Sequence, residues 1–110
     1  MKFTRYLYEP KQTMIVLTKK RLTEFAVSHP HSKGALDVWY RIVKEADWSN
    51  FNQMRMVFGS VDAVGNDLYV FNIRGNEYRL IVRIIFQVRT VFIKFIGTHK
   101  QYNDINLSRL

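Results

Sequence analysis

Residues 68–102 read LYVFNIRGNEYRLIVRIIFQVRTVFIKFIGTHKQY, and this stretch decides the fold that the sequence predicts. It holds three runs rich in Val, Ile, Phe and Tyr, which are residues that favour β-strands. Turn-like breaks at residues 74–76 and 87–90 separate the runs, and Gly75 and Asn76 can adopt the positive φ of a hairpin turn. We therefore predict an antiparallel meander with strands over residues 68–73, 77–87 and 91–98.

Side-chain alternation divides this predicted sheet into two faces. One face of the middle strand carries Tyr78, Leu80, Val82, Ile84 and Phe86, and the other carries Arg79, Ile81, Arg83 and Ile85. In the last strand, Val91, Ile93 and Phe95 are expected on the core face, with Phe92, Lys94 and Ile96 opposite. Residues 74–100 hold six Lys or Arg and one acid, Glu77. The sequence therefore predicts a core face and a basic face, the latter presenting Arg79, Arg83 and Lys94.

Helical patterns precede the sheet. After a short β-like run at 14–17, the expected segments are a helix over 19–28, a loop over 31–34, a helix over 35–46, a short helix ending at 57 and a loop over 60–67. Thr18 is expected to cap the first helix, and Ser49 or Asn50 the third. Residues 100–107 fit either a short helical turn or an edge strand. This order predicts an α+β fold with two N-terminal helices packed on an antiparallel sheet.

Domain organisation follows from length and from the character of the N-terminus. The 110 residues suffice for one domain with a single modest core. Residues 1–13 show neither helical nor strand periodicity, so we interpret them as an N-terminal extension to a domain over residues 14–110. An ordinary N-terminal arm of that domain is an equally good interpretation.

Composition excludes several classes of function. A net charge of +8 and a pI near 10 indicate a polyanionic partner: nucleic acid, an acidic protein or an anionic membrane. No apolar run is long enough to span a bilayer. The chain has no cysteine and three histidines, so thiolate chemistry is excluded and a structural zinc site is not expected. We expect no metal and no other cofactor, and a reducing cytoplasm fits the lack of cysteine.

His99 and Tyr102 follow the last predicted strand, beside the basic face. Cutting RNA without a metal requires a base for the 2′-hydroxyl proton, an acid for the leaving 5′-oxygen, and cations for the charge that grows on the phosphate. An imidazole suits either proton role, and Tyr102 would lie on the same side of a helical turn as His99. Arg79, Arg83 and Lys94 would hold phosphate groups. A non-catalytic RNA-binding module, or a protein that docks an acidic partner, fits the same composition.

Four stretches carry a resemblance to a known family: MIVLTKKRLTEFAVSHP (14–30), VWYRIVKEADW (38–48), VFNIRGNEYRLIVRI (70–84) and VFIKFIGTHKQYNDI (91–105). They resemble the HigB-type toxins of bacterial type II toxin–antitoxin systems, within the RelE superfamily. The most specific part is N-x-x-G-N-x-Y-R-L followed by F-I-G-T-H-x-x-Y. Members of this family typically begin where Met14 stands, which favours the interpretation of residues 1–13 as an extension.

The resemblance implies a small α+β, RelE-like toxin that cleaves mRNA on translating ribosomes and is held inactive by a helix-turn-helix, HigA-like antitoxin. The residues that match the family motif are Asn76, Arg79, Thr98, His99 and Tyr102. We expect the catalytic residues to be His99, Tyr102 and Arg79, and the residues that bind RNA phosphates to be Arg74, Asn76, Arg83, Lys94 and Lys100.

The sequence departs from the family pattern at two places. Asn103 stands where the family usually has Asp, and Lys100-Gln101 stands where a small residue and an acid are common. The first change removes a carboxylate and the second adds positive charge beside the site. The division of the acid and base roles between His99 and Tyr102 stays open.

Overall fold

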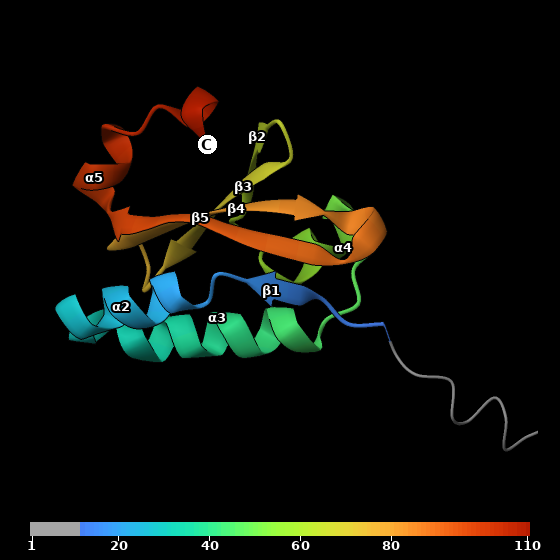
Figure 1. Ribbon diagram of the computed structural model, residues 1–110, viewed down its shortest axis with the longest axis horizontal. Coiled ribbons are helices and arrows are strands. Elements are labelled where there is room, and N and C mark those ends of the chain that lie inside the picture. The colour runs from blue at the N-terminus through green and yellow to red at the C-terminus, as the bar shows by residue number, and fades with distance from the viewer. Residues whose placement is uncertain (1–11) are drawn as a thin grey trace, which may run out of the picture.

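A computed structural model describes residues 12–110 of the chain, so most of the expected extension over residues 1–13 lies outside the described residues. The α-helices are α2 (Lys20–Ser28), α3 (Lys33–Glu45), α4 (Phe51–Val57) and α5 (His99–Asn103). The strands are β1 (Ile15–Leu17), β2 (Asp62–Gly65), β3 (Leu68–Ile73), β4 (Tyr78–Ile85) and β5 (Thr90–Thr98). In Figure 1, α2 and α3 lie along one side of the sheet and α5 with the C-terminal segment lies on the other. The α+β fold with two N-terminal helices on a sheet is confirmed.

The sheet is larger than the predicted meander. Five strands run in the order β1-β5-β4-β3-β2, with β1 parallel to β5 and the other neighbours antiparallel. The prediction of a loop over residues 60–67 was wrong, because residues 62–65 form β2. Asn66 and Asp67 both have positive φ, at 57° and 60°, which is the backbone of a two-residue hairpin turn. The turn formers in this segment therefore make a tight hairpin that joins β2 to β3.

The helix boundaries required three corrections. Thr18 is not the N-cap of α2: Lys19 occupies that position without a side-chain cap, while the Thr18 hydroxyl donates to the Ile93 carbonyl at 3.1 Å. The predicted loop over 31–34 was also wrong, since residues 30–32 form a 3₁₀ turn that runs directly into α3, which begins at Lys33. The second helix accordingly starts two residues before the predicted 35. The Asn50 cap of α4 is confirmed, with its side-chain oxygen accepting from the Gln53 N–H at 3.0 Å.

The main core lies between the sheet and helices α2 and α3. As predicted, one face of β4 enters this core through four residues that are at most 6 % exposed: Tyr78, Leu80, Val82 and Ile84. Trp39 of α3 meets Phe71 of β3 edge to face, with ring centroids 5.4 Å apart. The predicted core face of the middle strand is therefore confirmed.

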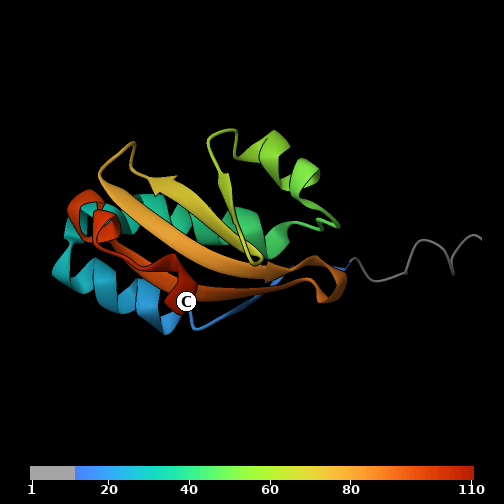
Figure 2. The ribbon, with the colours of Figure 1, turned by 90° about the horizontal axis from the view of Figure 1, so that it is seen from above.

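The opposite face of the sheet is partly covered, which the sequence did not indicate. Leu68, Val70 and Ile81 form a second buried cluster against four apolar residues of the C-terminal segment: Tyr102, Ile105, Leu107 and Leu110. Figure 2 shows this segment over the sheet, in red, seen from above. The expectation of an open basic face was therefore wrong in part, because a second apolar layer occupies the middle of that face.

A β-bulge at Lys94 changes the side-chain parity of β5. Val82 of β4 pairs with Ile93, but the preceding Ile81 pairs with Phe95, so Lys94 is the extra residue. Phe95 consequently packs in the second cluster and Ile96 in the main core. The uninterrupted alternation predicted for residues 91–96 was wrong after Ile93.

The end of β5 is joined to α5 by a compact capping arrangement. The Thr98 hydroxyl accepts from the Gln101 N–H at 3.1 Å, and the Gln101 side-chain oxygen accepts from the Thr98 N–H at 2.8 Å. Of the two alternatives for residues 100–107, the helical turn is therefore present, beginning one residue earlier at His99. A Cβ added to Gly97 would lie 2.5 Å from Cζ of Phe95 and 2.7 Å from Oε1 of Gln101. Gly97 thus gives the capping side chain its space.

Gly97→Ala is expected to destabilise the protein by about 1–3 kcal/mol, because the added methyl group must displace both Phe95 and Gln101. Urea unfolding followed by circular dichroism measures this change. Gly34→Ala is the matched control, since a Cβ there meets no described atom within 4 Å and the residue is helical. That substitution should stabilise the protein by up to about 1 kcal/mol. Equal effects of the two substitutions would contradict the proposed tight packing around Gly97.

Candidate active site

Three segments meet at one end of the β4–β5 pair. Arg79 of β4 pairs with Gly97, and Tyr78 pairs with Thr98, so the start of α5 lies beside the start of β4. The His99 N–H donates to the Glu77 carbonyl at 3.1 Å, which ties α5 to the turn between β3 and β4. The predicted catalytic residues Arg79, His99 and Tyr102 therefore come from adjoining segments.

Arg79 and Tyr102 are in direct contact. The Arg79 guanidinium carbon lies 5.9 Å from the centre of the Tyr102 ring, within the range of a cation–π interaction. The Arg79 Nη1 also donates to the Asn76 carbonyl at 3.3 Å. Both side chains are half-buried, and Tyr102 packs against the second apolar cluster. The ring therefore holds the arginine at the surface end of that cluster.

His99 is exposed at the first position of α5. Its Nδ1 lies 3.4 Å from the side-chain nitrogen of Asn103, one turn further along the helix. The Thr98–Gln101 capping pair fixes the backbone of this turn. His99 is therefore exposed to solvent on a short helix whose first turn is fixed by the hydrogen bonds between Thr98 and Gln101.

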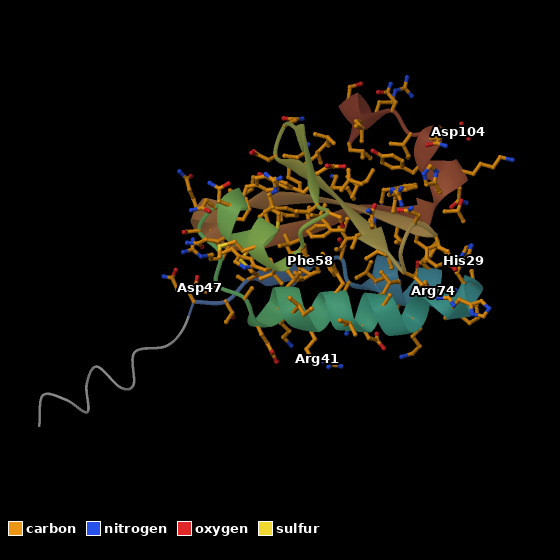
Figure 3. All side chains as sticks on the ribbon, turned by 180° about the vertical axis from the view of Figure 1, so that it is seen from behind. His29, Arg41, Asp47, Phe58, Arg74 and Asp104 are labelled. Carbon is orange, nitrogen blue, oxygen red and sulfur yellow. The ribbon has the colours of Figure 1, made fainter. Side chains whose placement is uncertain are left out.

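The turn between β3 and β4 forms the rim of the site. Arg74 and Gly75 have φ of 52° and 64°, so the predicted hairpin turn is present, although Arg74 and not Asn76 shares the positive φ with glycine. The Arg74 Nη1 bonds to the Glu77 carboxylate at 2.7 Å, and both side chains are about half exposed. Figure 3 shows Arg74, His29 and Asp104 at the same end of the molecule. An ion pair this exposed contributes little to stability and leaves Arg74 accessible.

Two of the predicted phosphate-binding residues lie away from this end. Arg83 is four residues along β4 from Arg79, a distance of about 13 Å at the usual rise of a strand. Its guanidinium donates to the Asn66 carbonyl at 3.3 Å and to the main-chain oxygen of Leu110 at 3.2 Å. Lys94 is half-buried at the bulge in β5. Lys100, in contrast, is exposed on α5 beside His99.

Sequence reasoning missed two residues that shape the site, Glu77 and Gln101. Glu77 acts through its main-chain oxygen and its ion pair with Arg74, for which the sequence holds no signal. Gln101 could have been found, because Thr98-x-x-Gln101 has the spacing of a capping box. His29 lies outside the site and packs as a structural residue, since its ring stacks on Phe25 at 4.1 Å and meets Tyr78 edge to face.

The clear electrostatic perturbations lie outside the site. Burial raises the pKa of the Tyr69 phenol, and the nearby Asp67 carboxylate adds to this shift. The hydrogen bond from Lys33 lowers the pKa of the Asp37 carboxyl on α3, partly opposed by desolvation, with the charges of Lys33, Lys19 and Arg41 also contributing. In the part of the chain that the structure describes, no three His, Asp or Glu residues are grouped so as to hold a metal ion. Residues 12–110 also include no helix long and apolar enough to cross a membrane.

Comparison with known proteins identifies the family. Residues 32–105 match the HigB toxin family, described as the RelE-like toxic component of a toxin–antitoxin system. The chain is 33 % identical over 94 residues to the mRNA interferase HigB of Escherichia coli O6:H1 (strain CFT073), covering 84 % of this chain and 91 % of that protein. It is 28 % identical over 92 residues to the mRNA interferase toxin HigB of Escherichia coli K12, covering 82 % and 88 %. An equally similar mRNA interferase HigB occurs in Shigella flexneri.

The family match spans the second helix, the whole β-sheet apart from β1, and the junction that carries His99 and Tyr102. The resemblance to HigB-type toxins is thereby confirmed, and the match takes in three of the four stretches, those at 38–48, 70–84 and 91–105. The chain belongs to the HigB family of RelE-like toxins, the toxic components of toxin–antitoxin systems.

Proposed function

We propose that this chain is an endoribonuclease that cleaves mRNA without a metal ion and so inhibits translation and growth. The names of its relatives as mRNA interferases support this activity. The observation that carries the proposal is the contact of Arg79 with Tyr102 at the junction from which His99 projects. A fixed cation beside a histidine and a tyrosine provides the groups that phosphodiester transfer requires.

The proposed reaction is an attack of the RNA 2′-hydroxyl on the adjacent phosphorus. The 2′-oxygen forms a bond to phosphorus and loses its proton, while the bond from phosphorus to the 5′-oxygen breaks and that oxygen gains a proton. The products are a 2′,3′-cyclic phosphate and a free 5′-hydroxyl. We assign the contacts with these two oxygens and their protons to His99 and Tyr102, and the stabilisation of the extra negative charge to Arg79.

Arg79 is well suited to the phosphate. Its planar guanidinium has five N–H donors. The two contacts with main-chain carbonyls, those of Asn76 and Tyr78, both come from Nη1, so the donors on the other two nitrogens can face a phosphate. The Tyr102 ring restricts the rotation of the side chain, so less conformational entropy is lost when a phosphate binds. Because the charge is fixed before the reaction, it stabilises the transition state without reorganisation.

The remaining cations are proposed to bind the RNA on either side of the cleaved bond. Arg74 and Asn76 on the turn, with Lys100 on α5, would contact phosphates nearest the site. Lys94 and Arg83 lie further along the same pair of strands and would contact RNA at a greater distance. Arg83 already donates to two main-chain oxygens, so only its remaining N–H groups would serve this role. We further propose that the substrate is ribosome-bound mRNA and that the protein acts in the cytoplasm. Its proposed partner is a helix-turn-helix, HigA-like antitoxin.

His99→Ala and Arg79→Ala are each expected to lower the rate of mRNA cleavage by about 10²-fold or more, because each removes a group that acts on the phosphate or its protons. Expression from a tightly controlled promoter in bacteria, with growth curves and mapping of transcript 5′-ends, measures the effect. His31→Ala and Arg41→Ala are matched controls, since both residues are exposed on the helical layer and should leave growth arrest intact. If all five proteins leave growth and transcripts alike, the proposal is wrong.

Analysis of the RNA ends tests the chemistry separately. Cleavage by this site should leave a 2′,3′-cyclic phosphate at the upstream fragment, since the 2′-oxygen is the nucleophile. Salt-dependent RNA binding that survives His99→Ala, without cleavage on ribosomes, would instead support a non-catalytic RNA-binding module.

A further inference from the structure

We propose that Asn103 is a positioning residue for His99. In this arrangement the Asn103 amide donates to Nδ1 of the imidazole, so the neutral ring carries its proton on Nε2 and meets RNA as a hydrogen-bond donor. This inference rests on the proposed nuclease function and deepens it, because it decides whether the histidine can act as the base. The neutral His99 would then donate a hydrogen bond from Nε2 to the phosphate or the leaving 5′-oxygen without giving up its proton, and it would not accept the 2′-hydroxyl proton.

The contact suggests the direction of the hydrogen bond that we propose. His99 and Asn103 are four residues apart on α5, so their side chains lie on the same face of the helix. Asn103 turns its amide nitrogen toward the ring, with Nδ2 3.4 Å from His99 Nδ1. An amide NH₂ group only donates, so we assign Nδ1 as the acceptor. A neutral imidazole with an accepting Nδ1 carries its hydrogen on Nε2.

The rest of the ring's surroundings leave Nε2 as the nitrogen for substrate. The backbone of His99 is held by the Glu77 carbonyl, and the Thr98–Gln101 pair fixes the turn on which the ring stands. The side chain of His99 is exposed, so RNA can approach the nitrogen that Asn103 does not occupy. Asn103 is thus the contact that selects between the two ring nitrogens.

This selection has a chemical consequence. A base for the 2′-hydroxyl must present an unprotonated nitrogen, and in this ring the unprotonated nitrogen faces Asn103. The outward Nε2–H instead suits an oxygen on which negative charge grows, and a neutral N–H donor held in place stabilises such charge. Proton removal from the 2′-hydroxyl therefore belongs to another group.

The charged groups near the ring do not reverse this assignment. Helix α5 contacts β4 and β5, where the charged residue at this end is Arg79, and α5 itself carries Lys100. Glu77 on the adjoining turn is paired with Arg74, and Asp104 directly follows α5. The side chain that contacts the imidazole is that of Asn103, which is neutral, so it orients the ring without adding a charge.

Nitrogen-15 NMR of the histidine rings in the full chain tests the proposal without RNA. At a pH where the imidazole is neutral, His99 is expected to show a protonated Nε2 and an unprotonated Nδ1. Asn103→Asp should reverse this, because a carboxylate accepts from Nδ1–H, and Asn103→Ala should give a mixture of both tautomers. Asp104→Asn is the matched control, since it changes one neighbouring charge without touching the ring, and the tautomer should stay as in the wild type.

Cleavage assays provide the second readout. Asn103→Ala should lower the cleavage rate by about 10-fold to 100-fold through loss of ring orientation, while circular dichroism shows an unchanged fold. Asn103→Asp should shift the pH dependence of cleavage, whereas Asp104→Asn should not. A protonated Nδ1 in the wild type, or a tautomer that neither substitution of Asn103 changes, would overturn the inference. If the wild type fails to cleave RNA while the tautomers behave as expected, the nuclease proposal alone is lost.

Discussion

Strands β4 and β5 are paired from Ile85 and Thr90 at one end to Tyr78 and Thr98 at the other, and both the fold and the candidate site depend on this ladder. Three consecutive residues of β4 are completely buried: Leu80, Ile81 and Val82. Burying each of these side chains contributes roughly 1.5–3 kcal/mol. Because successive side chains enter different apolar layers, a slip by one residue would move every one of them to the wrong layer. The register is therefore fixed from both faces. Because α5 directly follows β5, this register also fixes the position of α5.

The bulge at Lys94 adapts this ladder to the site. If the pairing of Val82 with Ile93 continued without the extra residue, Ile96 would stand opposite Arg79. The bulge places Gly97 there instead, and a Cβ at this position would collide with Phe95 and Gln101. Phe95 is at the same time brought into the second cluster, against which Tyr102 also packs. One inserted residue thus places a glycine where the Thr98–Gln101 cap needs space, and it moves Phe95 to the face of the sheet that the C-terminal segment covers.

Much of the fold could be predicted because β3 is a run of strand-favouring residues, β4 alternates between two faces, and the helices have clear apolar stripes. The bulge could not be predicted, since the run Val91 to Ile96 is apolar at almost every position. Without alternation of polar and apolar residues, the sequence does not show which side chains face which side of the sheet. Strand β2 was missed because its four residues have weak strand preference and its turn is only two residues long. The proximity of the proposed site residues was predicted in part: the structure brings Arg79, His99 and Tyr102 to one end, but it separates Arg83 and Lys94 from them. Glu77 escaped notice because it acts mainly through its backbone.

The C-terminal segment separates Arg83 from Arg79, the cation at the other end of β4. By covering Ile81 and its neighbours, it converts the middle of the basic face into a second core, and Arg83 donates to the main-chain oxygen of Leu110 in this segment. Releasing Arg83 for a phosphate would take this donor from the half-buried Leu110 oxygen, which is costly. Arg74 differs, because its partner is an exposed carboxylate worth at most about 1 kcal/mol. A phosphate can replace that carboxylate with a bidentate, charge-assisted pair, so RNA should exchange partners at the turn and leave the Arg83 contacts intact.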